Sequence, residues 1–209
     1  MRVYLARHGE TTWNVVGRYQ GQRDDSILTA RGELQAAALA RALQDANLQR
    51  IVSSPLQRCL QTSNAVARSC GVSTETELLL REIGHGTWEG LLKDEVAQLD
   101  PERLELWRDE PYTVSFDGGE TLEQVTQRWH EFTRDFNPAG PALVVTHDVL
   151  VRLALIESGA YAASDFWRIP CTNGAYAVFD VDRRTWEPID ACVDAHLSGL
   201  LADTSAQAL

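Results

Sequence analysis

The chain has 209 residues, of which 44% are hydrophobic and 23% are charged. These proportions are ordinary for a globular protein, exclude a fibrous repeat or an extended disordered chain, and suit one domain over residues 1–209. The formal net charge of −11 at pH 7 repels nucleic acid and anionic membrane surfaces as partners, whereas clustered arginines and backbone N–H groups could still bind a small anion at contact distance.

The cysteines and the N-terminal segment favour the reducing cytoplasm. The four cysteines contain no C-x-x-C motif and are scattered along the chain: Cys59, Cys70, Cys171 and Cys192. A chain of this size does not depend on disulfides. The N-terminus reaches Arg7 and His8 before a signal segment could form, and no apolar run approaches membrane-spanning length. We therefore expect a cytoplasmic protein.

The first half of the chain alternates strand and helix patterns. Residues 3–6 form a nearly continuous apolar run, as in a strand that is buried on both faces. Residues 29–47 repeat alanine and leucine at three- and four-residue steps behind a Thr29 cap, which predicts a helix. Residues 50–53 are a shorter strand candidate. Ser54 and Pro55 are a natural N-cap and first helical residue, so Arg58 should fall in the opening turn of the next helix.

The second half continues the alternation. Residues 91–107 are interpreted as helical, and residues 109–119, punctuated by proline and glycine, as a loop and candidate lid. Residues 121–124 match a capping box, and the aromatic stripe that follows is typical of core packing. Residues 142–145 are a second continuous apolar run.

The C-terminal part favours a late strand or hairpin and then a tail. The strand is predicted over residues 175–179, a turn over residues 182–184, and a flexible tail over residues 198–209. The alternation as a whole predicts an α/β fold, a three-layer α/β/α sandwich around a mostly parallel central sheet.

Polar residues follow three of the predicted strands. Arg7 and His8 come after the first, Arg58 after residues 50–53, and His147 after residues 142–145. Ligands of open α/β sheets bind beyond the carboxyl ends of the strands, so we expect these side chains to converge. Paired guanidinium groups and helix N-termini match the oxygens of a phosphate.

A phosphate monoester imposes three chemical requirements. Its negative oxygens must be neutralised, a nucleophile must attack in line, and an acid must protonate the departing alkoxide. A neutral imidazole is a good nucleophile near pH 7, and its phosphorylated form is reactive enough to be hydrolysed.

The segment around Arg7-His8-Gly9 resembles the R-H-G signature of the histidine phosphatase superfamily, which contains phosphoglycerate mutases and many small phosphatases. The blocks that carry the resemblance follow the family's order over most of the chain: residues 5–14, 17–21, 28–32, 53–58, 80–83, 86–90, 118–121 and 144–147. The resemblance implies the phosphoglycerate mutase-like form of the predicted sandwich.

The resemblance also implies a role for each matching residue. His8 would be the phosphorylated nucleophile, and Arg7, Arg58 and His147 would hold the transferring phosphoryl group. Glu82 would first donate a proton and then act as the base that activates water. Asn14, Gln20 and Gly21 match positions that line the substrate pocket in relatives. No metal or other cofactor is implied.

Two residues depart from the family's usual pattern. His85 stands where relatives commonly have an acidic or aromatic residue, and it would enter the pocket wall either as a contact to substrate or as a structural residue. Asp148 follows His147, where a small residue is usual, and so adjoins the substrate pocket. Its carboxylate would repel phosphate unless it turned away, for example onto the N-terminus of its own helix.

The predicted function is hydrolysis of small phosphorylated metabolites by a metal-independent phosphomonoesterase. The chain lacks the thiolate-phosphatase, H-E-x-x-H and phosphate-loop motifs, and arginines beside His8, His85 and His147 would oppose a metal there. Within the family the alternative is a phosphoglycerate mutase, which the compact length and the Trp88-Glu89-Gly90 segment disfavour. A catalytically silent phosphoester-binding module is the alternative from another class.

Overall fold

The structure, a computed structural model, describes residues 1–182, 185–202 and 207–208. Its centre is a six-stranded sheet in the order β3-β2-β4-β1-β5-β6. The first four strands in that order are parallel, and β5 and β6 are antiparallel at one side. The strands are β1 (Arg2–Arg7), β2 (Arg50–Ser53), β3 (Thr74–Thr76), β4 (Ala142–Thr146), β5 (Tyr176–Asp182) and β6 (Thr185–Val193).

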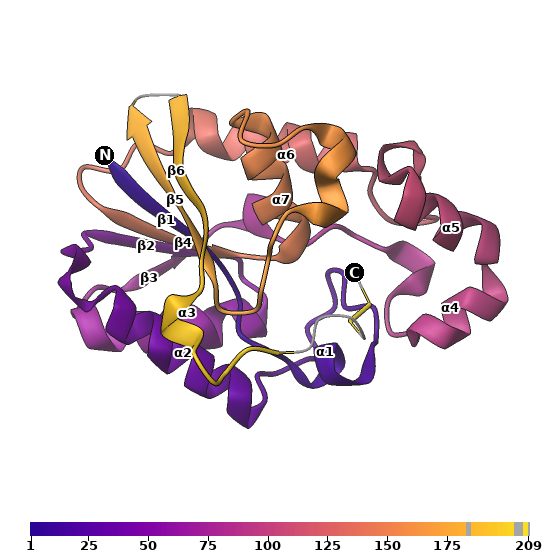
Figure 1. The fold of residues 1–209 in the computed structure, drawn as a ribbon, viewed down its shortest axis with the longest axis horizontal. Helices are drawn as coiled ribbons and strands as arrows, with labels where there is room; N and C mark the ends of the chain where they lie inside the picture. Colours follow the sequence, from indigo (N-terminus) through magenta and orange to yellow (C-terminus); the bar gives the residue numbers. More distant parts are fainter. Residues whose placement is uncertain (183–184, 203–206, 209) are drawn as a thin grey trace.

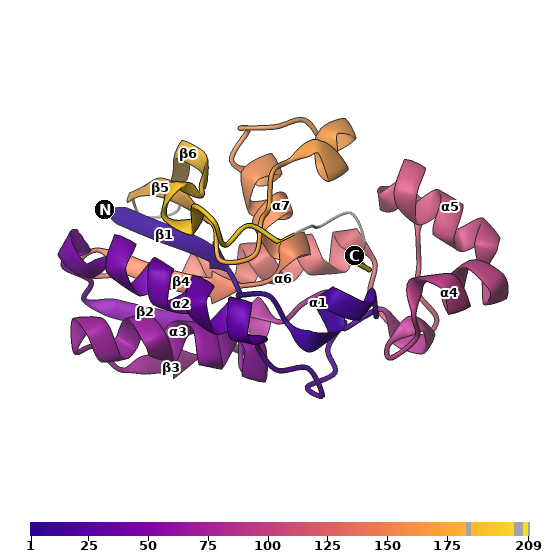
Figure 2. The ribbon, with the colours of Figure 1, turned by 60° about the horizontal axis from the view of Figure 1, so that its bottom comes forward.

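Helices cover both faces of the sheet (Figure 1). On one face lie α2 (Ala30–Ala42) and α3 (Gln57–Cys70), and on the other lie α6 (Leu122–Asp135) and α7 (Asp148–Glu157). This arrangement confirms the expected three-layer α/β/α sandwich around a mostly parallel sheet. The helices α4 (Lys93–Leu99) and α5 (Pro101–Asp109) project beyond the sandwich in both ribbon views (Figure 2), and the short α1 (Thr12–Val16) lies between them and the sheet.

The central strands are apolar on both faces because each face meets a helical layer. In β1, Val3 and Leu5 join the core beneath α6 and α7, whereas Ala6 joins the core beneath α2 and α3. In β4, Val144 and Val145 divide in the same way. Alternate side chains of a strand point to opposite faces, so burial on both sides requires the continuous apolar runs seen in the sequence.

Two predicted helices are shorter than their sequence patterns suggest. The pattern over residues 29–47 gives α2, capped by Thr29, which ends at Ala42 and continues only as a 3₁₀ turn. The pattern over residues 91–107 gives α4 and α5 in place of one helix, because the chain breaks at Asp100 before Pro101. A proline is tolerated in the first turn of a helix but not in its interior. The 3₁₀ helices are Gln44–Ala46, Leu78–Leu80, Gly86–Trp88, Pro111–Thr113, Ala163–Arg168 and Ala195–Leu197.

The predicted start of α3 was wrong by two residues. Leu56, and not Ser54, is the N-cap, and the helix begins at Gln57. The hydroxyl of Ser54 instead lies 2.7 Å from the Nε2 atom of His147, a tertiary contact that sequence rules for caps do not contain. Arg58 still falls in the first turn of α3, as expected.

The C-terminal hairpin is confirmed as β5 and β6, with Asp182 paired to Thr185. Arg183 and Arg184, which belong to the predicted turn, lie outside the described residues. Of the predicted tail, residues 198–202, 207 and 208 are described, and Gln207 and Ala208 are buried. Among the described residues, no helix has both the length and the apolar character needed to cross a bilayer.

The cap of α6 gives a test of local stability. Thr121 accepts a hydrogen bond from the backbone N–H of Gln124, whose side chain caps the N–H of Thr121 in return. Replacement Thr121→Ala should lower the free energy of unfolding by about 1 kcal/mol, measured by urea denaturation. The matched control Thr126→Ala, in the interior of the same helix, should be neutral or slightly stabilising because alanine has the higher helix propensity. Equal losses in both variants would contradict the capping role.

Candidate active site

The parallel pairing of the central strands brings the predicted site residues together. Arg7 is the last residue of β1 and pairs with Thr146 at the end of β4. The backbone N–H of His8 continues the ladder with a 3.0 Å bond to the carbonyl of Thr146, and Ser54 donates to the carbonyl of Val145 at 2.9 Å. As a result the rings of His8 and His147 lie with their centroids 5.3 Å apart.

The protonation of His8 is fixed by its surroundings. Its Nδ1 atom lies 2.8 Å from the carbonyl oxygen of Gly9, and since a carbonyl can only accept, Nδ1 carries the proton and donates. The pKa of His8 is well below its ordinary value because of burial and because of the charges of Arg58 and Arg7. His8 is therefore a neutral imidazole whose Nε2 atom keeps its lone pair, as a nucleophile requires.

His147 has the opposite tautomer. Arg58 donates from Nε to the Nδ1 atom of His147 at 3.2 Å, so this Nδ1 is an acceptor. The proton is on Nε2, which donates to the hydroxyl of Ser54 at 2.7 Å. Burial and the charge of Arg58 lower the pKa of His147 well below its usual value. His147 thus holds a neutral N–H donor beside His8.

Arg58 is fully buried and is held by backbone oxygens. Beyond its bond to His147, it donates to the carbonyl of Gly21 at 2.8 Å and to that of Arg23 at 3.1 Å. These carbonyls belong to the loop after α1. The loop therefore fixes the guanidinium without neutralising it, because its oxygens carry only partial charge, and leaves a positive charge beside His8.

Arg7 is paired with Asp148 in the interior. Its Nη1 atom lies 3.0 Å from Asp148 Oδ2 and 2.6 Å from the carbonyl oxygen of Cys171. Asp148 also binds Arg152, one turn along α7, through its second oxygen. Burial acts to raise the pKa of Asp148, but the charges of Arg152 and Arg7 outweigh it and lower the pKa below its ordinary value. Asp148 turns toward these two arginines.

Glu82 has the character of a proton donor at neutral pH. It follows the 3₁₀ turn Leu78–Leu80 and is only 7% exposed. Burial, followed by the charge of Asp148, raises its pKa to about 7, although the backbone N–H of Ile83 and the nearby arginines oppose the shift. A carboxyl group with this pKa can both give and take a proton near neutrality.

A pocket collects most of the predicted residues. It is lined by Arg7, His8, Gln20, Gly21, Arg58, Glu82, His85, Asp148, Val149 and Ala208. His147 contacts Arg58 and the ring of His8 at its edge. Asn14 lies beside the pocket in α1, where its Oδ1 atom accepts from the N-cap Thr11. Gln20 also faces inward, and its Oε1 atom accepts from the hydroxyls of Thr11 and Ser26.

His85 also belongs to the pocket wall. It packs edge-on against Tyr19, Trp107 and Phe116, and neither of its ring nitrogens has a hydrogen-bond partner among the residues that the structure describes. Burial and the charge of Arg58 lower its pKa to about 3, so the ring is neutral. A buried imidazole without partners has an unused donor and an unused acceptor beside the reacting groups.

Sequence reasoning missed several residues of this site. Arg152 had a signal, because Asp148 and Arg152 have the i, i+4 spacing of a helical ion pair. Asn173, which donates to the carbonyl of His8 at 3.3 Å, and Gln207, which binds Arg7, had none. Both are ordinary polar residues in irregular segments, and only the tertiary fold brings them to the pocket.

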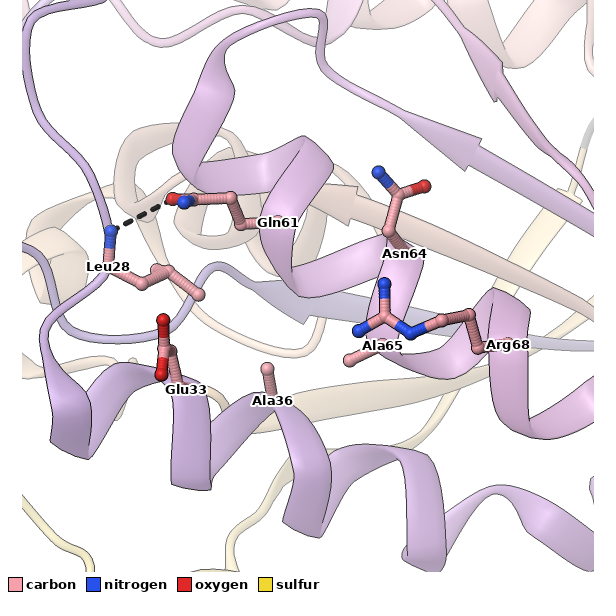
Figure 3. Close-up of a pocket in the computed structure, with 7 residues that line it drawn as sticks. All are labelled: Leu28, Glu33, Ala36, Gln61, Asn64, Ala65 and Arg68. Carbon is pink, nitrogen blue, oxygen red and sulfur yellow. Dashed lines mark hydrogen bonds between the residues drawn. The ribbon is translucent and has the colours of Figure 1, made fainter.

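A larger pocket lies elsewhere and is not the site of this chemistry. It measures about 420 Å³ and opens between α2 and α3 (Figure 3). Its charged side chains, Glu33 and Arg68, are exposed, and none of the predicted site residues lines it. Within the part of the chain that the structure describes, no three histidine, cysteine or carboxylate side chains are grouped to hold a metal. Two buried arginines favour an anion in the pocket at the sheet edge.

Comparison with known proteins shows the family of this chain. The family model of the histidine phosphatase superfamily (branch 1) matches residues 3–191. The chain belongs to the histidine phosphatase superfamily. Phosphoserine phosphatase 1 of Hydrogenobacter thermophilus is 34% identical over 200 residues, which cover 94% of each chain. Probable phosphoglycerate mutase GpmB of Escherichia coli is 35% identical over 156 residues, or 71% of this chain and 70% of that one.

A solved structure shows the same fold. The structure of Bacillus stearothermophilus YhfR superposes with a TM-score of 0.87 at 30% identity and covers 94% of this chain and 98% of that one. The sandwich, and the order of its elements, are therefore those of the histidine phosphatases.

The raised pKa of Glu82 has a consequence for stability. Its folded-state pKa, about 7, exceeds the ordinary value of 4.5, so its protonated form stabilises the fold at low pH and this contribution is lost as pH rises through 7. Replacement Glu82→Gln should therefore raise the free energy of unfolding at pH 8, by about 3 kcal/mol at most, and change it little at pH 4.5. Urea denaturation in phosphate-free buffer at both pH values measures this difference.

The control is Glu105→Gln, which alters an exposed carboxyl of α5. We expect it to change stability by less than about 0.5 kcal/mol at either pH. A Glu82→Gln variant that is less stable than the parent protein at pH 8 would show that the carboxylate is stabilised in the fold, contrary to its assigned environment.

Proposed function

We propose that this protein is a metal-independent phosphomonoesterase that hydrolyses small phosphate esters through a phosphohistidine formed on Nε2 of His8. The observation that carries the proposal is the combination of a neutral His8 with a free Nε2 lone pair and a protonatable Glu82 in one arginine-lined pocket. The four cysteines are all unpaired, which supports a cytoplasmic location.

In the first half-reaction, Nε2 of His8 attacks the phosphorus atom in line with the ester oxygen. Arg7 and Arg58 stabilise the charge on the equatorial oxygens. His147, whose only N–H donates to Ser54, would donate to the phosphoryl group only if it exchanged that partner. The P–N bond forms as the P–O bond to the leaving group breaks. Glu82 transfers its proton to the departing oxygen, which leaves as an alcohol.

In the second half-reaction, water replaces the alcohol. The ionised Glu82 accepts a proton from the water as its oxygen attacks phosphorus, the P–N bond breaks, and the electron pair returns to Nε2 of His8. Inorganic phosphate and the protonated carboxyl are regenerated. Since the pKa of Glu82 is about 7, both protonation states are accessible at the pH where the reaction runs.

The share of this chain that aligns with each relative favours hydrolysis over mutase activity. The phosphoserine phosphatase of Hydrogenobacter thermophilus aligns over 94% of this chain, whereas the probable phosphoglycerate mutase of Escherichia coli aligns over 71%. Small phosphorylated metabolites are therefore the proposed substrates, and phosphoserine is the first to test.

The covalent intermediate provides the direct test. Brief incubation with a ³²P-labelled ester and acid-free quenching should leave label on the protein, stable to alkali and labile to acid as a phosphoramidate. His8→Ala should abolish both the label and the release of inorganic phosphate, because it removes the imidazole whose Nε2 lone pair attacks phosphorus. The control His130→Ala removes an exposed histidine of α6 and should preserve both.

Two results would contradict hydrolysis by this route. Retention of phosphate release in His8→Ala would exclude the phosphohistidine. Interconversion of 2- and 3-phosphoglycerate that is faster than release of phosphate, in a chelator-containing assay, would assign the protein to the mutases instead.

The role of Glu82 predicts a dependence on the leaving group. A p-nitrophenolate needs little protonation, whereas a serine alkoxide must be protonated as it departs. Glu82→Gln should therefore lower kcat/KM for phosphoserine by roughly 10²- to 10⁴-fold, and lower that for p-nitrophenyl phosphate by much less. Steady-state kinetics with both esters measures the difference. Equal losses with both would show that Glu82 does not act as the general acid for the first step.

A further inference from the structure

The end of the chain reaches into the catalytic pocket. The Oε1 atom of Gln207 accepts a hydrogen bond from Nη2 of Arg7 at 2.7 Å and another from Nδ2 of Asn14 at 3.2 Å. Gln207 is 4% exposed and Ala208 is 5% exposed. Ala208 lines the same pocket as His8, Arg58 and Glu82. Residues about 200 positions apart in the sequence thus share one site.

The orientation of the Gln207 amide is set by a second contact. Its Nε2 atom donates to Oδ1 of Asn173 at 2.8 Å, and the amide of Asn173 in turn donates to the carbonyl of His8. The amide nitrogen of Gln207 is thereby used, and its oxygen faces the cationic side of the pocket. An oxygen that accepts from a guanidinium and from an amide N–H has the environment of a phosphate oxygen.

The Gln207 oxygen occupies one of the few donors that Arg7 offers. It accepts from Nη2 of Arg7 at 2.7 Å, whereas Nη1 of Arg7 is already used by Asp148 and by the carbonyl of Cys171. A phosphate oxygen that binds Nη2 in the same position must therefore displace the Gln207 side chain.

We propose that the Gln207 side chain is an internal competitor for phosphate: its amide oxygen occupies a phosphate-oxygen position on Arg7, and substrate must displace it. This inference rests on the proposed function for the identity of the ligand. The Gln207 side chain can be displaced because a neutral amide makes weaker hydrogen bonds to a guanidinium than a phosphate dianion does. A carboxylate at the same position would bind the arginines more tightly and resist displacement.

Displacement of Gln207 would also give the ester room. Gln207 lines a neighbouring cavity of about 270 Å³, whose walls include Tyr19, Leu104, Trp107 and Trp167. The segment thus lies between the catalytic pocket and an aromatic cavity formed by α5 and the Ala163–Arg168 turn. Movement of the segment would open this cavity toward Arg7, which Gln207 contacts.

The test measures phosphate binding directly, by isothermal titration calorimetry with sodium orthophosphate, and uses two variants. Gln207→Ala removes the competing oxygen, and deletion of residues 207–209 removes the segment. Both should lower the Kd for orthophosphate by at least about tenfold, because the apparent Kd is the intrinsic value divided by the fraction of protein with an open pocket. KM for p-nitrophenyl phosphate should fall in parallel. The control Gln44→Ala, exposed beyond α2, should change neither.

Several outcomes would overturn the competition. A larger Kd in both variants would show that Gln207 is a constituent of the binding site. An unchanged Kd in both variants, or orthophosphate that binds none of the proteins, would show that Gln207 does not compete with phosphate. The competition and the proposed function can fail independently. If the variants have a lower Kd for orthophosphate but the parent protein forms no phosphohistidine, Gln207 competes with phosphate and the proposed reaction is excluded.

Discussion

The parallel pairing of β1 with β4 is the constraint on which the site depends. It sets Arg7 opposite Thr146 and continues one residue further, through the bond from the His8 N–H to the carbonyl of Thr146. The ladder pairs five residues of each strand, from Val3 with Ala142 to Arg7 with Thr146, and a slip of one residue would break all of these pairs. The pairing that builds the centre of the sheet thus also holds the rings of His8 and His147 beside each other.

The second organising feature is buried charge. Arg58 is surrounded by backbone carbonyls and the lone pair of His147, none of which neutralises it. Burial, and then the charge of Arg58, lower the pKa values of His8 and His147 and keep both imidazoles uncharged. Arg7 is balanced by Asp148, which is shared with Arg152. The charge of Asp148 then adds to burial in raising the pKa of Glu82. Asp148, which departs from the family's usual pattern, therefore contributes to the raised pKa of Glu82.

Apart from the carboxylate of Asp148 on Arg7, the oxygens that bind the two pocket arginines are neutral. The carbonyls of Gly21 and Arg23 bind Arg58, the carbonyl of Cys171 binds Arg7, and the amide of Gln207 binds Arg7 as well. Such acceptors hold the guanidinium groups in position while leaving their charge available, which is the preorganisation that phosphoryl transfer requires. The Gln207 oxygen, unlike the carbonyls, belongs to a side chain, which can turn away without moving the backbone of the pocket.

The sequence by itself determined the fold class, the buried strands and the convergence of Arg7, His8, Arg58 and His147, because apolar periodicity and the carboxyl ends of parallel strands are local and topological properties. The role assigned to Glu82 came from the family resemblance. The cap of α3 was misplaced because Ser54 binds His147, 93 residues away. Only the tertiary structure decided that Asp148 faces Arg7, that His85 has no hydrogen-bond partner among the described residues and that Gln207 binds Arg7. Each of these features depends on which groups, distant in the sequence, are buried next to one another. Burial changes the strength of electrostatic interactions and hydrogen bonds, and no local pattern of residues encodes it.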